Sequence, residues 1–188
     1  MGAINREYYF DSVRGSLFSG HMNQDQVDGQ NALLDYAEQL QWDDRWTAYL
    51  LATTYHETAL TMQPIPEYGC GKGKPYGQPD GPYNQCYYGR GFVQLTWYDN
   101  YKKQDEKLNL NGQLVQDADQ ALDLQIATEV IFGGMEDGDF TGVGLPKYIN
   151  DQQTDFYNAR KIVNGLDQAS AIQGYAVKFL NAITHGAG

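Results

Sequence analysis

The pattern of hydrophobic and polar positions predicts a mostly helical chain. Apolar residues recur at helical spacing over residues 6–18 and 24–41. A third helix is predicted from a cap at Asp43 or Asp44 to about residues 57–61. Further helices are expected over about 96–107 with Thr96 as the cap, from Asp117 or Asp119 to about 131, from Thr154 to about 163, and over about 168–183.

The composition of the chain changes between residues 63 and 91, where Pro and Gly residues alternate. This composition favours a long ordered loop with a short hairpin rather than a helix. Long loops inside compact domains are usually functional, so this loop is expected to form one wall of a cleft. With no internal repeat, the whole chain, residues 1–188, is predicted to be a single, mainly α domain without a second domain.

The third predicted helix carries a carboxylate where an apolar residue is expected. At about 100° per residue, Trp46, Tyr49, Leu50, Thr53 and Glu57 fall within one arc, with Glu57 near its middle. Burial and the negative end of the helix dipole both favour a protonated carboxyl, which can donate a proton. The alternative is an ordinary Glu paired with a basic side chain at the end of a helix.

Composition narrows the classes of function. A chain of 188 residues with 41% hydrophobic residues is long enough for one core, and no apolar run is long enough to span a membrane. The net charge of −11 argues against nucleic acid and anionic membranes as partners, whereas many Tyr, Asn and Gln suit a sugar. The first residues lack a secretory signal, so the chain is expected to stay in the cytosol of the cell that makes it.

Several chemistries can be set aside. Thr61 occupies the position where a zinc-binding His-Glu-x-x-His helix starting at His56 needs its second histidine, so no metal site is predicted. Residues 69–74 lack the spacing of a phosphate-binding loop. Cys70 and Cys86 either staple their shared loop or remain free thiols. A cysteine nucleophile activated by His56, as in a wall amidase or peptidase, stays open.

Three segments carry a family resemblance: residues 52–58 (ATTYHET), 87–101 (YYGRGFVQLTWYDNY) and 160–165 (RKIVNG). In this order they resemble glycoside hydrolase family 19, and more closely the bacteriophage endolysins that share its catalytic domain with plant-type chitinases. The opening segments 9–14 (YFDSVR) and 26–29 (QVDG) also look like the start of such endolysins. The resemblance implies an α-rich, lysozyme-like α+β fold without a cofactor.

The resemblance also implies an inverting glycosidase. Glu57 would be the general acid, and a second carboxylate about 6.5–9.5 Å away would activate water. Glu67 is the candidate base and Asp80 the reserve, although the spacing from Glu57 is shorter than in the plant enzymes. The alternative for Glu67 is a solvated loop acid.

By the same resemblance, Thr96 would hold or polarise the attacking water. Gln94, Asn100 and Asn164 would hydrogen-bond the sugars, because neutral amides both donate and accept without the desolvation cost of a charge. For Thr96 and Asn164 the alternative is a role at a helix end, and a buried Arg90 is expected to brace the loop. His56 and Tyr88 are expected on the substrate side, with Tyr88 packing an edge on the cleft.

The leading hypothesis is therefore a monomeric, bacteriolytic phage endolysin that cuts β-1,4 bonds in the glycan strand of peptidoglycan. Such an enzyme would stay in the host cytoplasm until its release to the cell wall, and residues 1–188 would form its catalytic domain without a separate wall-binding module. A chitinase of the same fold is the alternative enzyme. A cysteine-dependent wall enzyme and a non-catalytic sugar-binding module are the remaining classes. No nucleic acid, membrane, metal or cofactor is expected as a partner.

Overall fold

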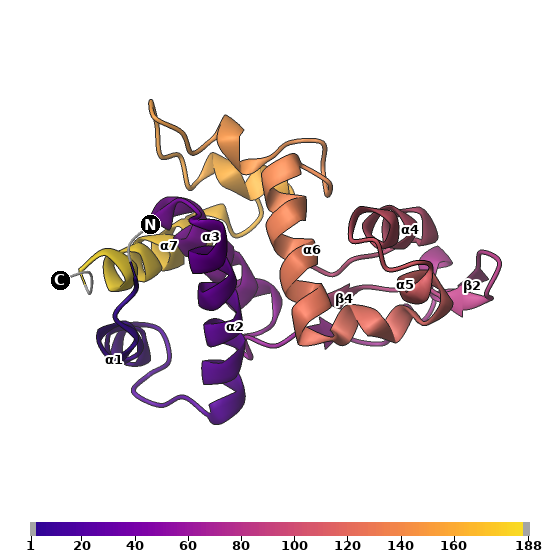
Figure 1. The fold of residues 1–188 in the computed structure, drawn as a ribbon, viewed down its shortest axis with the longest axis horizontal. Helices are drawn as coiled ribbons and strands as arrows, with labels where there is room; N and C mark the ends of the chain where they lie inside the picture. The colour runs from indigo at the N-terminus through magenta and orange to yellow at the C-terminus, as the bar shows by residue number, and fades with distance from the viewer. Residues whose placement is uncertain (1–2, 186–188) are drawn as a thin grey trace. The chain divides into compact units, whose positions relative to one another are not determined.

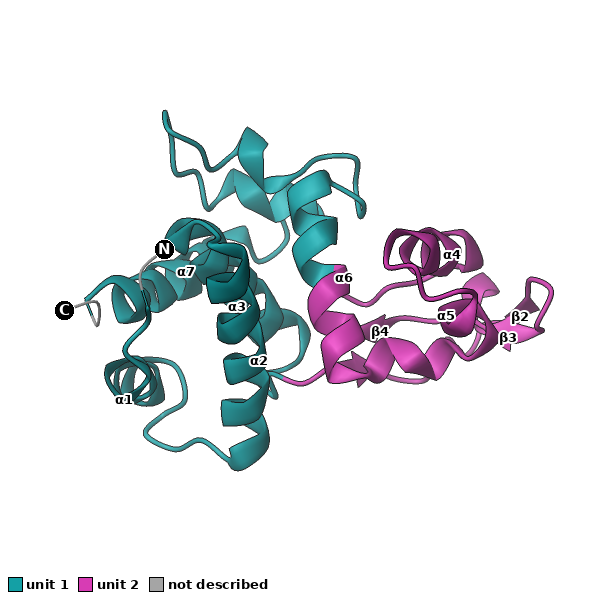
Figure 2. Cartoon of the chain, in the orientation of Figure 1, with its two compact units in different colours: residues 1–62, 131–188 teal, residues 63–130 magenta. Residues whose placement is uncertain are grey.

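The structure, a computed structural model, describes residues 3–185 and confirms a mainly helical chain with a few short strands (Figure 1). The chain divides into two compact units (Figure 2). The first comprises residues 1–62 and 131–188, and the second comprises residues 63–130. That residues 1–188 act as one catalytic domain stays a prediction. No helix within the described residues is both long and apolar enough to cross a bilayer.

The first unit is built around two helices, α3 (Asp44–Glu57) and α7 (Ala169–Thr184), which pack against each other. Helix α1 (Arg6–Ser16) packs on α7, and α2 (Gln24–Leu40) packs on α3. Tyr55 joins these layers, because its ring makes edge contacts with Phe18 and Phe179, at centroid distances of 5.2 and 6.1 Å. The same unit holds the short 3₁₀ helices η3 (Leu145–Lys147) and η4 (Asn158–Ile162).

Helix starts follow from their caps. Asn23 and Gln26 form a reciprocal capping box at α2, with side-chain to backbone distances of 2.8 and 2.9 Å. Asp43 caps α3 by accepting a hydrogen bond from the Arg45 backbone N–H at 2.7 Å. The cap predicted at Asp43 or Asp44 is therefore confirmed as Asp43.

The second unit contains the predicted Pro- and Gly-rich loop, which is an ordered segment with two small antiparallel sheets. Strand β1 (Ile65–Pro66) pairs with β4 (Arg90–Gly91), and β2 (Pro79–Asp80) pairs with β3 (Gln85–Cys86). The 3₁₀ helix η1 (Pro75–Gly77) lies between them in sequence. Helix α4 (Tyr98–Lys107), α5 (Gln113–Gln116) and the 3₁₀ helix η2 (Ala118–Leu122) follow.

Helix α6 (Leu124–Asp137) begins in the second unit and ends in the first. The single helix predicted from Asp117 or Asp119 was wrong at its start, because Asp123 is extended (φ −63°, ψ 131°) and ends η2. Asp123 accepts hydrogen bonds from the backbone N–H groups of Gln125 and Ile126, at 2.9 and 3.1 Å, and so caps α6.

Two other predicted caps were also wrong. Thr96 does not cap α4, whose N-cap is Trp97 without a side-chain bond; its hydroxyl donates to the Gln94 carbonyl at 2.7 Å. Thr154 begins no α-helix, because its hydroxyl accepts a hydrogen bond from Arg45 at 3.1 Å. The segment after it forms only the short η4. In both cases the threonine hydroxyl forms a hydrogen bond with another partner and does not bond to a backbone N–H in the first turn of a helix.

Candidate active site

Glu57 is the last residue of α3, and the predicted half-buried acid is confirmed. The helix is buried continuously from Thr47 to Tyr55. Glu57 follows this buried stretch at the edge of the core, and 19% of its side chain is exposed. Its Oε1 accepts a hydrogen bond from Nη1 of Arg160 at 2.6 Å. The basic partner expected under the alternative interpretation is therefore present.

Arg160 lies in η4 and is almost completely enclosed, with 2% of its side chain exposed. Its Nε donates to the Asp167 carbonyl at 3.0 Å, so the guanidinium is held from two sides. Burial raises the pKa of Tyr49 well above its ordinary value, and the nearby Arg160 charge acts in the opposite direction. Tyr49 therefore stays neutral beside the ion pair.

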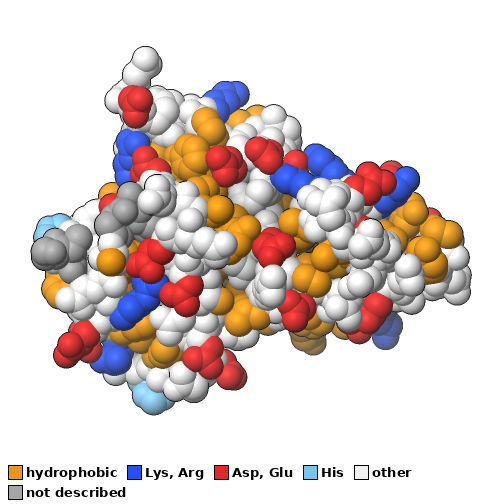
Figure 3. All heavy atoms as spheres, viewed as in Figure 1, with side chains coloured by type: hydrophobic (Ala, Val, Ile, Leu, Met, Phe, Trp, Pro, Cys, Tyr) orange, Lys and Arg blue, Asp and Glu red, His pale blue; other side chains and the backbone are white. Residues whose placement is uncertain are grey.

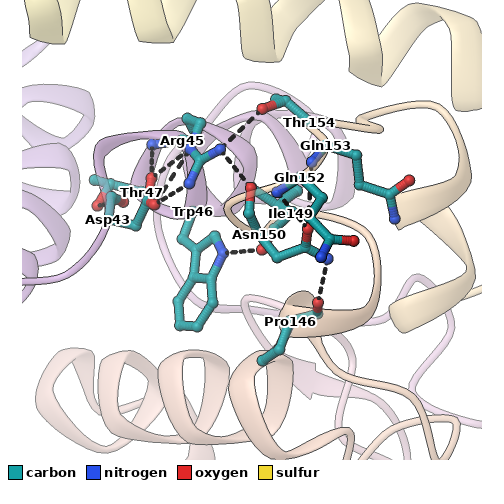
Figure 4. A network of polar contacts seen from close by, with 10 residues as sticks. All are labelled: Asp43, Arg45, Trp46, Thr47, Pro146, Ile149, Asn150, Gln152, Gln153 and Thr154. Carbon is teal, nitrogen blue, oxygen red and sulfur yellow. Dashed lines mark hydrogen bonds and ion pairs between the residues drawn. The ribbon is translucent and has the colours of Figure 1, made fainter.

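The other end of α3 is tied to the same part of the chain that leads to Arg160. Figure 4 shows Arg45 reaching from α3 to the segment 149–154, where Nη1 donates to the Asn150 carbonyl at 2.9 Å. The Trp46 indole N–H donates to the Ile149 carbonyl at 2.9 Å. Helix α3 is therefore anchored at both ends, to the segment 149–154 at its first turn and to Arg160 at its last residue. These two anchors fix the position of Glu57 relative to Arg160.

Glu67 lies in the second unit, directly after β1, and is half-buried rather than a solvated loop acid. Its backbone N–H donates to the Gly89 carbonyl at 2.7 Å. Its Oε2 accepts a hydrogen bond from the Tyr76 hydroxyl at 3.3 Å. Its Oε1 is buried and has no hydrogen-bond partner among the described residues. A buried carboxylate oxygen without a donor is costly, so this atom is suited to take a donor from a ligand or water.

Tyr76 is supported by its own surroundings. Burial, together with the charge of Glu67, raises the pKa of the Tyr76 hydroxyl, so it remains a protonated donor. Its ring meets the Trp97 ring edge-on at 5.3 Å between centroids. Trp97 is 47% exposed and has a positive φ of 75°, a conformation that is uncommon for a bulky residue. Strained positions of this kind concentrate at functional sites.

The segment 87–91 is braced from within, as predicted for Arg90. Arg90 is 4% exposed, pairs with Asp119 at 2.8 Å and donates to the Cys86 and Tyr88 carbonyls at 3.0 and 3.2 Å. Its guanidinium lies 3.5 Å from the centroid of the Tyr88 ring. One face of the Tyr88 ring is thus covered by Arg90, and Tyr88 as a whole is half-buried.

Gly89 allows the close approach of two predicted site residues. A Cβ at this position would lie 2.9 Å from Oε1 of Gln94 and 3.4 Å from Cβ of Glu67. Gln94 itself adopts a positive φ of 56°, and its amide donates to the Ile65 carbonyl at 3.1 Å. The glycine of this motif therefore serves packing around Gln94 and Glu67.

The remaining predicted residues are placed as follows. The side-chain amide of Asn100 donates to the Thr96 carbonyl at 2.8 Å, and Asn164 is exposed and accepts from the Gly165 backbone N–H at 2.8 Å. His56 is half-buried beside Glu57 in sequence. Asp80 is exposed and accepts from the backbone N–H of Gly81. The sugar-binding roles of these residues stay predictions.

The candidate residues divide between the two units. Glu57, His56 and Asn164 belong to the first, and Glu67, Asp80, Tyr88, Gln94, Thr96 and Asn100 to the second. Cys70 and Cys86 are free thiols, exposed and half-buried respectively. Within the described residues, no three His, Cys, Asp or Glu side chains are arranged to hold a metal ion.

Sequence reasoning missed two partners. Arg160 lies in the segment 160–165, and its place between the apolar residues Ala159 and Ile162 is the one signal in the sequence for a buried cation that needs an acidic partner. Tyr76 had no such signal, because it lies between Pro75 and Gly77 in an irregular loop.

Comparisons with known proteins give a fold. No protein-family model matches the sequence, and no curated protein matches it significantly. Among solved structures, chitinase C from Streptomyces griseus HUT6037 matches with a TM-score of 0.65 and 20% identity, over 100% of this chain and 81% of that one. A glutamate-to-glutamine mutant of chitinase C matches with a TM-score of 0.66 and 19% identity, over 98% and 78%. The chain therefore has the chitinase-like fold that its motifs implied, the fold of chitinase C.

Proposed function

We propose that this chain is an inverting glycoside hydrolase that cleaves β-1,4 bonds in polymers of N-acetylated hexosamines. The proposal is supported by two half-buried glutamates on a chitinase-like fold, Glu57 in the first unit and Glu67 in the second, each held by one specific partner within its own unit. Structural ion pairs also hold carboxylates, but Glu67 leaves one buried oxygen without a partner.

In the proposed mechanism, Glu57 donates its proton to the leaving glycosidic oxygen. Arg160, at 2.6 Å, then stabilises the carboxylate that remains. Glu67 accepts a proton from the attacking water at Oε1, while the Tyr76 hydroxyl holds Oε2. Attack from the opposite face of the sugar inverts the anomeric centre.

The glycan strand of peptidoglycan is the first candidate substrate, because the sequence motifs and the opening segments resemble phage endolysins. The test is incubation with purified sacculi, followed by reducing-end assays and mass spectrometry of the products. We expect new reducing ends, and their sugar identity separates a muramidase cut from a glucosaminidase cut. Cleavage of the peptide cross-links alone, or of no bond in sacculi or chitin, contradicts the proposal.

Chitin is the second candidate. It is favoured by the likeness to chitinase C and by the net charge of −11, which opposes approach to an anionic wall but not to a neutral polymer. On the face drawn in Figure 3, acidic side chains are spread over the surface with Lys and Arg among them. Release of soluble oligomers from chitin, with no products from sacculi, identifies this alternative.

The two candidate bases are separable by isosteric substitution. We expect Glu67→Gln to lower kcat by about 100- to 10,000-fold, because the amide cannot accept the proton of the attacking water. The matched change Asp80→Asn should leave kcat within about twofold, since Asp80 is exposed and bonded to its own loop. Steady-state kinetics on one soluble substrate measures both, and the reverse ranking would reassign the base to Asp80.

The cysteine-dependent alternative makes the opposite prediction for the two thiols. We expect the double variant Cys70→Ser, Cys86→Ser to retain wild-type turnover, because a glycosidase of this type uses carboxylates only. Hydrolysis rates before and after treatment with a thiol-alkylating reagent provide a second measurement on the unmodified chain. Loss of activity in both experiments supports a thiol nucleophile.

A further inference from the structure

The second unit contains a hollow that the proposed chemistry does not use. It lies among the tip of the β2–β3 hairpin, helix α4 and the loop that follows α4, with a cavity volume of about 420 Å³. This volume falls in the range of small-molecule sites in proteins. Its lining includes Pro82, Tyr83, Tyr98, Lys102, Asn109 and Asn111.

The loop on one side of the hollow is fixed by a buried acid. Asp105 is 4% exposed, and its two carboxylate oxygens accept hydrogen bonds from the backbone N–H groups of Gly112 and Leu114, each at 2.7 Å. Its backbone carbonyl also accepts from the Leu110 N–H at 3.0 Å. Asp105 thus accepts three hydrogen bonds, which hold the loop 109–112 in place. A loop that is already fixed loses less conformational entropy when a ligand binds.

The fixed loop presents two neutral amides. Asn109 and Asn111 both have a positive φ of 54°, and both are exposed. Among residues 3–185, neither side-chain amide has a protein hydrogen-bond partner. Each amide can both donate and accept, which matches hydroxyl and acetamido groups.

Aromatic rings form the opposite side. Gly81, with a φ of 64°, lies so close to Tyr98 that a Cβ would be 2.7 Å from the ring, and Tyr87 meets the same ring at a centroid distance of 5.2 Å. Tyr98 is thus immobilised. Tyr83, by contrast, is 45% exposed at the hairpin tip and can present a ring face to a ligand.

The hollow is also lined by one cation, Lys102, and two acids, Asp105 and Glu106. Lys102 lies 3.8 Å from Glu106 one helical turn away, and Asp105 is already used by the loop. Besides the exposed Lys102 and Glu106, the lining offers neutral amides and aromatic rings to a ligand. This combination suits an uncharged molecule with one apolar face and several hydrogen-bonding groups, rather than a phosphate or an acidic peptide.

We propose that this hollow is an accessory glycan-binding site that takes N-acetylhexosamine units of the polymer. Tyr83 stacks on a sugar ring, and Asn109 and Asn111 hydrogen-bond its polar substituents. The inference rests on the proposed substrate class but not on turnover, because none of these residues has a part in the proposed acid–base chemistry. Such a site holds a long chain, so it matters for the polymer and little for short oligomers.

Binding is tested on the full chain carrying Glu57→Gln, so that the probe is not consumed. We expect tri-N-acetylchitotriose to shift the backbone NMR signals of residues 83 and 109–112 together and saturably. Adding Tyr83→Ala with Asn111→Gly should weaken this binding by about tenfold or more, equivalent to at least about 1.4 kcal/mol. Glycine is chosen at position 111 because it keeps the positive φ while removing the amide.

Tyr157→Ala is the matched control, since Tyr157 is 39% exposed and belongs to the first unit. It should leave the shifts at 109–112 unchanged. If circular dichroism shows that the double variant is unfolded, the single variant Asn111→Gly replaces it in the binding experiment. Absence of saturable shifts at these residues, or unchanged binding in the variants, overturns the proposal.

A kinetic arm in the wild-type background separates this proposal from the proposed function. The double variant should lose activity on insoluble polymer while its kcat/KM on a short soluble oligomer stays within about twofold. Wild-type cleavage without NMR shifts at 109–112 refutes only the accessory site. Shifts at 109–112 with no cleavage of any polymer refute only the proposed hydrolase function.

Discussion

Glu57→Gln is expected to reduce the rate of glycan hydrolysis by about 100- to 10,000-fold, because the amide has no proton to donate to the leaving oxygen. The substitution keeps the shape of the side chain, and its amide oxygen can still accept the hydrogen bond that Arg160 donates at 2.6 Å. The loss should therefore appear in kcat, with KM nearly unchanged.

The structure adds a stability effect to this prediction. Arg160 is 2% exposed, so replacing the carboxyl group that accepts its hydrogen bond by an amide, a weaker acceptor, should lower the free energy of unfolding by about 1–3 kcal/mol. Urea unfolding followed by circular dichroism measures this change. Glu129→Gln is the control, because Glu129 lies on α6 and has no part in the proposed chemistry. It should alter neither kcat nor the free energy of unfolding substantially. Wild-type turnover by Glu57→Gln would refute the assignment of the acid.

Arg160→Met is expected to have the second large effect, on stability and rate together. Removing one partner of an enclosed ion pair costs about 3–5 kcal/mol, because Glu57 is left half-buried without its cation. The Asp167 carbonyl also loses its donor. We expect kcat to fall by about 100-fold as well, since the charge that stabilises the product carboxylate is gone.

A double-mutant cycle distinguishes a positioning role from simple unfolding. If Arg160 acts through Glu57, the double variant Glu57→Gln, Arg160→Met should lose much less stability than the sum of the single changes. Lys161→Met, at the exposed neighbouring position, should leave kcat and stability close to wild type. Additive losses of stability in the cycle would show that Glu57 and Arg160 are not energetically coupled in the folded chain.

Much of the helical framework followed from local chemistry. The ends of α2 and α7 agree with their hydrophobic periodicity within one or two residues, and Asp43 caps α3 as its position suggests. The stripe from Trp46 onward predicted Glu57 as a half-buried acid, although α3 is in fact buried on every face from Thr47 to Tyr55 and not along that stripe alone. The chitinase-like fold was implied by the motif residues 87–101 and is the fold of chitinase C.

Predictions that depended on a residue's partner were less secure. A threonine before an apolar run is a good cap in isolation, but Thr154 instead accepts a hydrogen bond from Arg45, distant in sequence. The helix predicted through Ala121 and Leu124 is interrupted at Asp123, whose carboxylate starts α6. Local propensity does not contain these alternatives, because each is decided by which groups the folded chain brings together.

The sequence by itself predicted the helical pattern, the half-buried Glu57 that we propose as the acid, and the loop that carries the candidate base, since all three depend on residues close together in the chain. Only the tertiary structure decided that Arg160 is the partner of Glu57, 103 residues away, and that Tyr76 holds one oxygen of Glu67 while the other has no partner. The physical reason is that burial makes an unpaired charge or polar group costly, and the donor that relieves this cost is selected by the packing of distant segments.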